Sequence, residues 1–132
     1  MTWSFSSTSN VVGIGIDTVE ILRFGLVLKR RPNLIRKLFS PQEIKYATKF
    51  KDPTQRFAVR FSAKEATMKA LGVGIGSFGF DEVEVISKNK APYIELRGRA
   101  LELANSKDIG KCLVSLTHTS VSATAIVVAL QI

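Results

Sequence analysis

Two charged residues one helical turn apart are the first candidates for chemistry. Glu65 and Lys69 lie in the stretch RFSAKEATMKALG (residues 60–72), whose other residues have the spacing of a packed helix. Four residues apart, they share a helical face and can form an ion pair that stabilises a helix only slightly. They can equally be a functional pair that binds a metal ion and an anion. A third charge, Lys64, falls among the apolar residues, and the sequence names no partner for it.

The helix that carries these charges is predicted over residues 54–71, with Gly72 as its C-cap. At about 100° per residue, its apolar residues fall into two arcs on opposite sides, so we expect it to pack between two layers. One arc consists of Phe57, Phe61, Met68 and Leu71, and the other of Val59, Ala63, Ala66 and Ala70. On the side of Glu65, the small residues Ala58 and Ser62 leave room for a ligand.

A second carboxylate, Asp17, ends the segment VVGIGID (residues 11–17), which has the alternation of a β-strand. Gly13 and Gly15 lie on the same face as Asp17, and glycines inside a strand indicate that something approaches closely. Two interpretations stay open. The clearing can admit a ligand beside Asp17, or it can allow tight packing while Asp17 caps the next helix.

His118, the only histidine, ends the segment CLVSLTHT beside Thr117, Thr119 and Ser120. Without a second histidine or cysteine nearby it cannot build a zinc site, and the sequence has no G-x-S-x-G nucleophile motif. His118 can be an ordinary hydrogen-bonded residue or, with its neighbouring hydroxyls, a contact for a phosphate group.

The loop GVGIGSFG (residues 72–79) contains the spacing G-x-G-x-x-G. A dinucleotide-binding fingerprint must follow a strand and open a helix, whereas this loop follows a helix and precedes the strand pattern FDEVEVI. The Rossmann interpretation is therefore rejected. The loop can still cradle a phosphate through its backbone N–H groups, or it can serve only as a connection.

The remaining elements predict an α+β domain with a largely antiparallel sheet packed against helices. A helical pattern covers residues 18–28, and the capping box SPQE (residues 40–43) begins a helix that runs to about Phe50. Two strand patterns, a short helix and a C-terminal hairpin follow the glycine loop. We expect residues 11–132 to form a single domain and residues 1–10 to be an N-terminal extension.

Composition favours a cytoplasmic protein of one domain. The chain has 132 residues, of which 45% are hydrophobic and 23% are charged. No stretch approaches the roughly 20 apolar residues of a membrane span, and the first ten residues lack the pattern of a secretion signal. The single cysteine, Cys112, cannot form an internal disulfide and is expected to enter a strand.

The formal charge of +8 is large enough to attract phosphates or acidic proteins. Five basic residues gather within residues 29–37. One rival interpretation is a module that binds nucleic acid phosphates, which explains the charge but not the isolated carboxylates. Another is a structural oligomer without chemistry, in which Glu65 and Lys69 only pair. We expect neither nucleic acid nor membrane as a partner.

Asp17, Glu65 and Lys69 together predict a site for a pyrophosphate bound to Mg²⁺. Mg²⁺ is usually held by one or two protein carboxylates, while water and phosphate oxygens complete its coordination. Phosphoryl transfer depends on positioning and on neutralisation of charge. The absence of a nucleophile motif is consistent with that chemistry.

Three segments resemble the signature blocks of the holo-acyl-carrier-protein synthases, the short type of 4′-phosphopantetheinyl transferase. They are GIGIDTVEILR (13–23), RFSAKEATMKALG (60–72) and SLTHT (115–119). The resemblance implies that the serine hydroxyl of an apo acyl carrier protein attacks the β-phosphate of coenzyme A, with release of adenosine 3′,5′-bisphosphate. It also implies a role in fatty acid synthesis and a homotrimer with active sites between subunits.

The resemblance assigns a role to each candidate residue. It implies Asp17 and Glu65 as Mg²⁺ ligands, and Lys69 as a catalytic residue that contacts a phosphate and stabilises the leaving group. The coenzyme A contacts that it implies are Arg60, Lys69, Gly72, His118 and Thr119, and the carrier contacts are Arg23 and the basic residues 29–37. The deprotonating group stays open between a side chain and a metal-bound water oriented by Asp17 or Glu65. The chain departs from the family pattern at Ser62, where alanine is common, and at Lys90, where glycine is common.

Overall fold

The computed structural model describes residues 10–87 and 91–131, so the first nine residues and Lys90 lie outside the described parts. Its elements follow the predicted order, and several boundaries differ. They are β1 (Val11–Glu20), α1 (Ile21–Arg30), α2 (Leu34–Leu38), α3 (Pro41–Ala47), α4 (Pro53–Ala70), the 3₁₀ turn η1 (Phe80–Glu82), β2 (Val83–Ile86), β3 (Tyr93–Leu96), α5 (Gly98–Ser106), β4 (Ile109–His118) and β5 (Ser122–Gln131).

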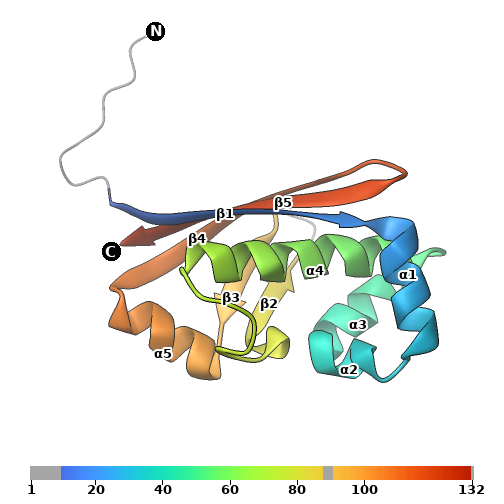
Figure 1. Cartoon of the computed structure of the whole chain (residues 1–132), viewed down its shortest axis with the longest axis horizontal. Helices are drawn as coiled ribbons and strands as arrows, with labels where there is room; N and C mark the ends of the chain where they lie inside the picture. The colour runs from blue at the N-terminus through green and yellow to red at the C-terminus, as the bar shows by residue number, and fades with distance from the viewer. Residues whose placement is uncertain (1–9, 88–90, 132) are drawn as a thin grey trace, which may run out of the picture.

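The strands form two antiparallel sheets, which confirms the predicted α+β class. One sheet has the order β1-β5-β4 and the other pairs β2 with β3. Figure 1 shows the three-stranded sheet along one side of the molecule and α4 running along it, with α1, α2 and α3 at one end and α5 at the other. No helix in the described parts is long and apolar enough to span a membrane.

The glycine face of β1 is covered by helix α4. A Cβ atom built on Gly13 would lie 1.9 Å from the carbonyl oxygen of Ala70, and one on Gly15 would lie 1.9 Å from that of Ala66. Any side chain at these two positions would push the helix away from the strand. The close approach predicted at the glycines is therefore the packing of α4, and the interpretation of this clearing as a ligand space is wrong.

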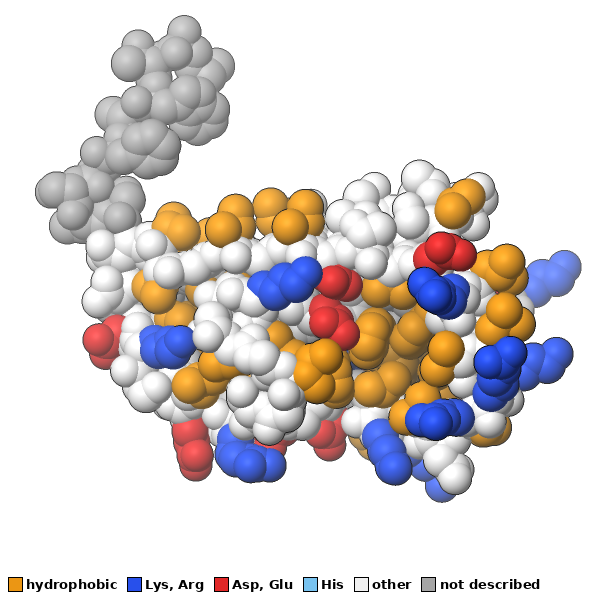
Figure 2. Space-filling view, viewed as in Figure 1, with side chains coloured by type: hydrophobic (Ala, Val, Ile, Leu, Met, Phe, Trp, Pro, Cys, Tyr) orange, Lys and Arg blue, Asp and Glu red, His pale blue; other side chains and the backbone are white. Residues whose placement is uncertain are grey.

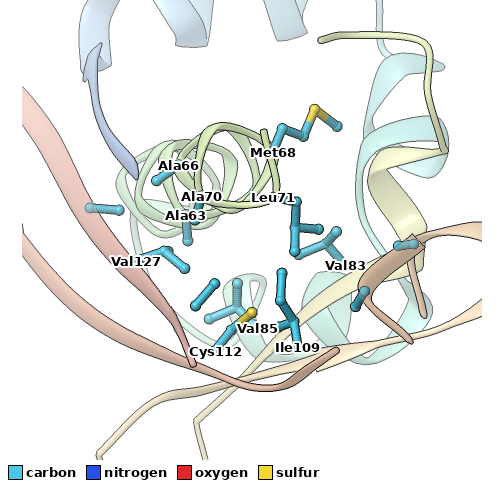
Figure 3. Packing of buried hydrophobic residues seen from close by; sticks show 14 of the residues in the cluster. Ala63, Ala66, Met68, Ala70, Leu71, Val83, Val85, Ile109, Cys112 and Val127 are labelled. Carbon is cyan, nitrogen blue, oxygen red and sulfur yellow. The ribbon is translucent and has the colours of Figure 1, made fainter. Parts of the chain in front are cut away.

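Both predicted apolar arcs of α4 are packed, but the hydrophobic core divides into two clusters along the length of the helix, and each cluster contains residues of both arcs. One buried cluster fills the space between α4, the three-stranded sheet and the β2–β3 pair (Figure 3), and includes Ala63, Leu71, Val83 and Val127. A second cluster joins the other end of α4 to α1, α2 and α3, and includes Phe24, Phe39 and Phe57. The helix is thus held in place from two sides, which fixes the directions of its charged residues.

Two predicted helix boundaries are wrong. Residues 18–20 belong to β1 because Glu20 pairs with Ser122 across the sheet, and this pairing overrides their local helical pattern. The helix that begins at the SPQE segment ends at Ala47, and not at Phe50. The predicted capping box at its start is confirmed: the Ser40 N–H donates to Glu43 Oε1 at 2.9 Å, and the Glu43 N–H donates to Ser40 Oγ at 3.2 Å.

Lys64, which had no partner in the sequence, is fully buried and bound on several sides. Its Nζ donates to Glu43 Oε1 at 2.7 Å and to the backbone carbonyls of Phe80 (2.8 Å) and Val83. The other oxygen of Glu43 accepts the Val85 N–H at 3.1 Å. This charge therefore joins α3, α4 and the start of β2, and its role is structural.

Candidate active site

A cavity of about 540 Å³ lies where β1 leads into α1, beside helix α4. It brings Asp17, Glu65 and Arg23 to one place, although they come from three different elements. The full lining is Asp17, Thr18, Val19, Glu20, Arg23, Phe61, Glu65, Val121 and Ser122. Figure 2 shows acidic and basic side chains side by side on this face of the molecule, over β1 and α4. The cavity is the candidate active site.

The backbone beside Asp17 is tied to α4. Ser62 Oγ donates to the Asp17 carbonyl at 2.8 Å, and Lys69 Nζ donates to the Ile16 carbonyl at 2.9 Å. Ser62, Glu65 and Lys69 are spaced three and four residues apart, so they share the helical face that meets β1. Asp17 does not cap the next helix, because Glu20 is the N-cap of α1 and its side chain makes no capping bond.

Lys69 forms an ion pair with Asp17, at 3.3 Å between Nζ and Oδ1. Of the two interpretations left open for Glu65 and Lys69, the simple ion pair is not the one observed, since the ion pairs of the described residues join Lys69 only to Asp17. The predicted space above Ala58 and Ser62 is also absent, because both residues are fully buried. The space for a ligand lies instead beside Phe61 and Arg23.

Glu65 lies in surroundings that disfavour its negative charge. Partial burial raises the pKa of Glu65, the nearby charge of Asp17 raises it further, and the charge of Lys69 opposes both effects. The two carboxylates line the same cavity and are therefore near neighbours. A cation placed between them would relieve that repulsion.

The donor set fits a hard cation such as Mg²⁺. The described residues contain no group of three or more side chains that could enclose a metal ion. Two carboxylates at the edge of an open cavity are what Mg²⁺ commonly uses, because it keeps water or phosphate oxygens in its remaining positions. Asp17 and Glu65 could therefore hold Mg²⁺ together with a bound phosphate.

Arg60 lines a different cavity, of about 340 Å³, on another side of α4. Its guanidinium lies over the Tyr46 ring, 4.1 Å from the centroid, and is almost fully buried. The Nε atom has no hydrogen-bond partner among the described residues. Burial lowers the pKa of Arg60, and the neighbouring Tyr46 raises it. Lys45 and Lys49 line the same cavity, so this second space is basic.

His118, Thr119 and Gly72 are not brought to the Asp17 cavity within one chain. His118 is exposed on β4, two strands away from β1 and thus roughly 10 Å from it. Thr119 Oγ1 accepts the N–H groups of Val121 and Ser122, both at 3.1 Å, and so holds the turn that borders the cavity. Gly72 follows Leu71, the C-cap of α4, so the predicted C-cap was one residue late; its φ of 73° is a conformation that favours glycine.

Six of the nine lining residues of the cavity were not predicted as site residues from the sequence: Thr18, Val19, Glu20, Phe61, Val121 and Ser122. Glu20 lies three residues after Asp17 within the first signature block, and that position could have marked it as a candidate site residue. Phe61 was assigned to the core arc alone, although it also forms a wall of the cavity. Ser122 could not be found, because only the pairing of β5 with β1 brings it there.

Comparisons with known proteins identify the family. The chain matches the model of the 4′-phosphopantetheinyl transferase superfamily over residues 13–124. It is 38% identical over 113 residues to the holo-[acyl-carrier-protein] synthase of Moorella thermoacetica, which covers 85% of this chain and 88% of that protein. The corresponding protein of Geobacter sulfurreducens is 38% identical over 121 residues, which covers 89% of this chain and 96% of that one.

A solved structure supports the same assignment. Holo-[acyl-carrier-protein] synthase of Helicobacter pylori, in complex with coenzyme A, superposes with a TM-score of 0.76 and 34% identity, over 88% of this chain and 98% of that chain. The chain therefore belongs to the 4′-phosphopantetheinyl transferase superfamily and, within it, to the holo-[acyl-carrier-protein] synthases, which are transferases. The resemblance seen in the sequence is confirmed.

Proposed function

We propose that this protein transfers 4′-phosphopantetheine from coenzyme A to the serine hydroxyl of an apo acyl carrier protein. The cavity that joins Asp17, Glu65 and Arg23 carries the proposal, because it places these two carboxylates, together with that of Glu20, beside a basic surface helix. In the reaction, the serine oxygen forms a bond to the β-phosphorus. The bond to the bridging oxygen of the pyrophosphate breaks, and adenosine 3′,5′-bisphosphate leaves. The proton of the serine passes to a base or to water.

Asp17 and Glu65 would hold Mg²⁺ at the edge of the cavity that both residues line. The ion would neutralise charge on the pyrophosphate during transfer. Lys69 lies within reach of the same phosphates because its side chain is half exposed at the rim. It would stabilise the leaving group, whose negative charge grows as the bond breaks.

The carrier would dock on helix α1. Arg23 lines the cavity, and Leu22 and Leu26 are 72% and 49% exposed on the same short helix. The basic residues 29–37 follow directly, and Figure 2 shows basic side chains gathered over this end of the molecule. An acidic carrier helix would find opposite charge and an apolar contact here. We assign the basic cluster to this protein partner.

Arg60 would contact a phosphate of coenzyme A from the second cavity. The guanidinium of Arg60 lines this cavity, and Lys45 and Lys49 add positive charge beside it. A phosphate is the natural acceptor for such a group. This arrangement supports the role expected for Arg60.

A homotrimer would supply the residues that one chain keeps apart. The outer face of the three-stranded sheet carries exposed apolar side chains on all three strands, namely Ile14, Ile16, Leu113 and Ile126. An apolar face of this kind is typical of a protein interface. We propose that subunits meet across it and that His118, Thr119 and Gly72 meet coenzyme A at a site shared by two subunits.

We further propose that residues 11–132 form the catalytic domain, that residues 1–10 are an extension of it, and that the enzyme acts in the cytoplasm in support of fatty acid synthesis. The family match over residues 13–124 supports these bounds.

The test is to incubate the protein with an apo acyl carrier protein, coenzyme A and Mg²⁺ and to weigh the carrier by mass spectrometry. We expect a gain of one phosphopantetheine group on the carrier serine, and no gain when a chelator removes the metal. Carriers from the same source should be tried in turn. No gain with any of them would rule out the proposed transfer.

A further inference from the structure

The ammonium group of Lys69 occupies the edge of the carboxylate site. Its Nζ lies 3.3 Å from Asp17 Oδ1 and 2.9 Å from the Ile16 carbonyl oxygen. The side chain of Lys69 is 54% exposed, whereas that of Asp17 is only 16% exposed. One carboxylate of the pair that would hold Mg²⁺ is thus already paired with a cation that belongs to the chain.

This pairing is easy to break. A half-exposed ion pair of lysine contributes little to stability, because water screens it and the long side chain loses freedom when it is fixed. A divalent cation at the same carboxylate would repel the ammonium at short range. Lys69 and the metal ion therefore cannot both keep close contact with Asp17 without cost.

We propose that Lys69 is a built-in counter-cation of the free enzyme, which leaves Asp17 when Mg²⁺ binds and then turns to the phosphates that arrive with it. The inference rests on the proposed function and adds a coupling to it: metal binding releases the lysine, and the released lysine is then available to bind phosphate. Without substrate, Lys69 weakens metal binding. With substrate, the phosphates offer the displaced ammonium a new partner.

A purely structural role predicts the opposite effect on metal binding. If Lys69 only fastened α4 to β1, its removal would loosen Asp17 and weaken the binding of a metal ion. Ser62 provides the comparison, because its hydroxyl fastens the same strand through the Asp17 carbonyl but carries no charge. The two roles can therefore be separated by the direction of the change in affinity.

The experiment measures binding of Mn²⁺, a hard divalent probe with a paramagnetic signal, to the full chain without coenzyme A. Lys69→Met is expected to bind Mn²⁺ about three- to tenfold more tightly than the native chain, because one repelling charge is gone. Lys51→Met is the charge-matched control: Lys51 is exposed before α4 begins, roughly 25 Å from the other end of that helix. It should stay within about twofold of the native affinity. Ser62→Ala should not bind more tightly.

A second measurement needs no variant that might fail to fold. In the native chain labelled with ¹³C at the lysine ε carbons, the Lys69 resonance should shift on addition of Mg²⁺, while that of Lys51 should stay in place. Lys69→Arg assigns the resonance. Unchanged or weaker Mn²⁺ binding by Lys69→Met, or a Lys69 resonance that does not move at saturating Mg²⁺, would overturn the inference.

The outcome is distinct from the test of the proposed function. A native chain that modifies the carrier, while Lys69→Met shows no gain in metal affinity, would contradict only the counter-cation role. A native chain that binds no divalent cation under any condition would remove the metal-ligand role of Asp17 and Glu65, and the counter-cation role with it.

Discussion

Lys64 and Lys69 stand on the same helix, and each pairs with a carboxylate, yet their surroundings differ. Lys64 and Glu43 are both fully buried, 2.7 Å apart, and further bonds to the backbone surround them. The Lys69–Asp17 pair is longer, at 3.3 Å, and lies at the rim of a cavity that Asp17 lines together with Glu65, whose carboxylate forms no ion pair with any residue that the structure describes. A buried charged group is tolerated only when it has its ion-pair and hydrogen-bond partners. A site that binds a cation must instead keep some negative charge that no basic side chain neutralises.

The helix produces these different surroundings by pointing its charged side chains in different directions. Lys64 and Glu65 are neighbours in sequence, but a step of about 100° points one toward β2 and the other toward the cavity beside β1. The two apolar clusters along α4 hold that orientation. The buried Lys64–Glu43 pair adds a further tether to α3 and to the start of β2, and so helps to position the helix that carries Glu65.

The largest effect is expected when the interior pair is broken. In Lys64→Met the carboxylate of Glu43 stays buried without its cation. We expect the free energy of unfolding to fall by about 3–5 kcal/mol. Chemical denaturation followed by circular dichroism measures it.

The double variant Lys64→Met/Glu43→Leu is the control for this effect. It removes both charges and fills the space with apolar groups, so most of the lost stability should return. If the single variant lost less than about 1 kcal/mol, the interior pair would resemble the exposed one, and the contrast between the two regions would fail.

The second effect falls on activity and not on stability. Glu65→Gln removes a proposed Mg²⁺ ligand while keeping the size of the side chain. We expect the rate of carrier modification, measured by mass spectrometry, to fall at least about 100-fold. The free energy of unfolding without metal should not fall, because the neutral amide no longer repels Asp17.

Glu102→Gln is the matched control for the loss of one carboxylate, since Glu102 is exposed on α5 and lines neither of the two cavities beside α4. It should modify the carrier at the native rate. Near-native activity of Glu65→Gln would show that Glu65 is not a metal ligand.

The sequence predicted the cavity of Asp17 and Glu65 better than the buried pair of Lys64 and Glu43. Asp17, Glu65 and Arg23 could be chosen because each residue stands within a recognisable block, and the cavity brings them together. The partner of Lys64 could not be predicted, because Glu43 also satisfies a local capping box and nothing local shows that its side chain reaches further. A helical wheel gives the direction of a side chain but not the element that it meets.

The glycines of β1 show a similar limit. Their types and spacing predicted a close approach, and the structure confirms that approach at Gly13 and Gly15. A ligand and a helix backbone impose the same requirement on a strand, so the sequence could not choose between them. The end of β1 was also misplaced, because its last residues are held by pairing with β5, which lies about 100 residues away.

The third prediction concerns the approach of the carrier to the exposed region. Arg23→Ala should raise the KM for the carrier about three- to tenfold, with little change in kcat, because an exposed charge at the edge of an interface mainly steers association. Raised ionic strength should increase the KM for the carrier more in the native enzyme than in this variant. Steady-state rates at two salt concentrations measure both effects.

Arg99→Ala is the control, because Arg99 is exposed on α5, at the other end of the molecule from α1 (Figure 1). It should leave the KM and its salt dependence unchanged. An Arg23→Ala variant with a native KM would show that the carrier docks elsewhere.

The smallest effect at neutral pH concerns the thiol of Cys112 in the hydrophobic core. Cys112 lies in the core cluster beside α4, and burial raises its pKa to about 11. An unfolded thiol has a pKa of about 8.5, so the folded state favours the neutral thiol. That contribution is fully present below about pH 8.5 and is lost as the pH rises toward 11.

The free energy of unfolding of the native chain should therefore fall between pH 8.5 and pH 10 by more than that of Cys112→Ala. Disulfide exchange with an aromatic reagent gives a second measure, since only the thiolate reacts: the native thiol should react at least about tenfold more slowly at pH 8 than the thiol of the chain unfolded in urea. Equal reactivity would show that this interior tolerates a charge without a partner. The close pairing of Lys64 and Glu43, which contact Val83 and Val85 of the same cluster, would then need a cause other than the cost of burial.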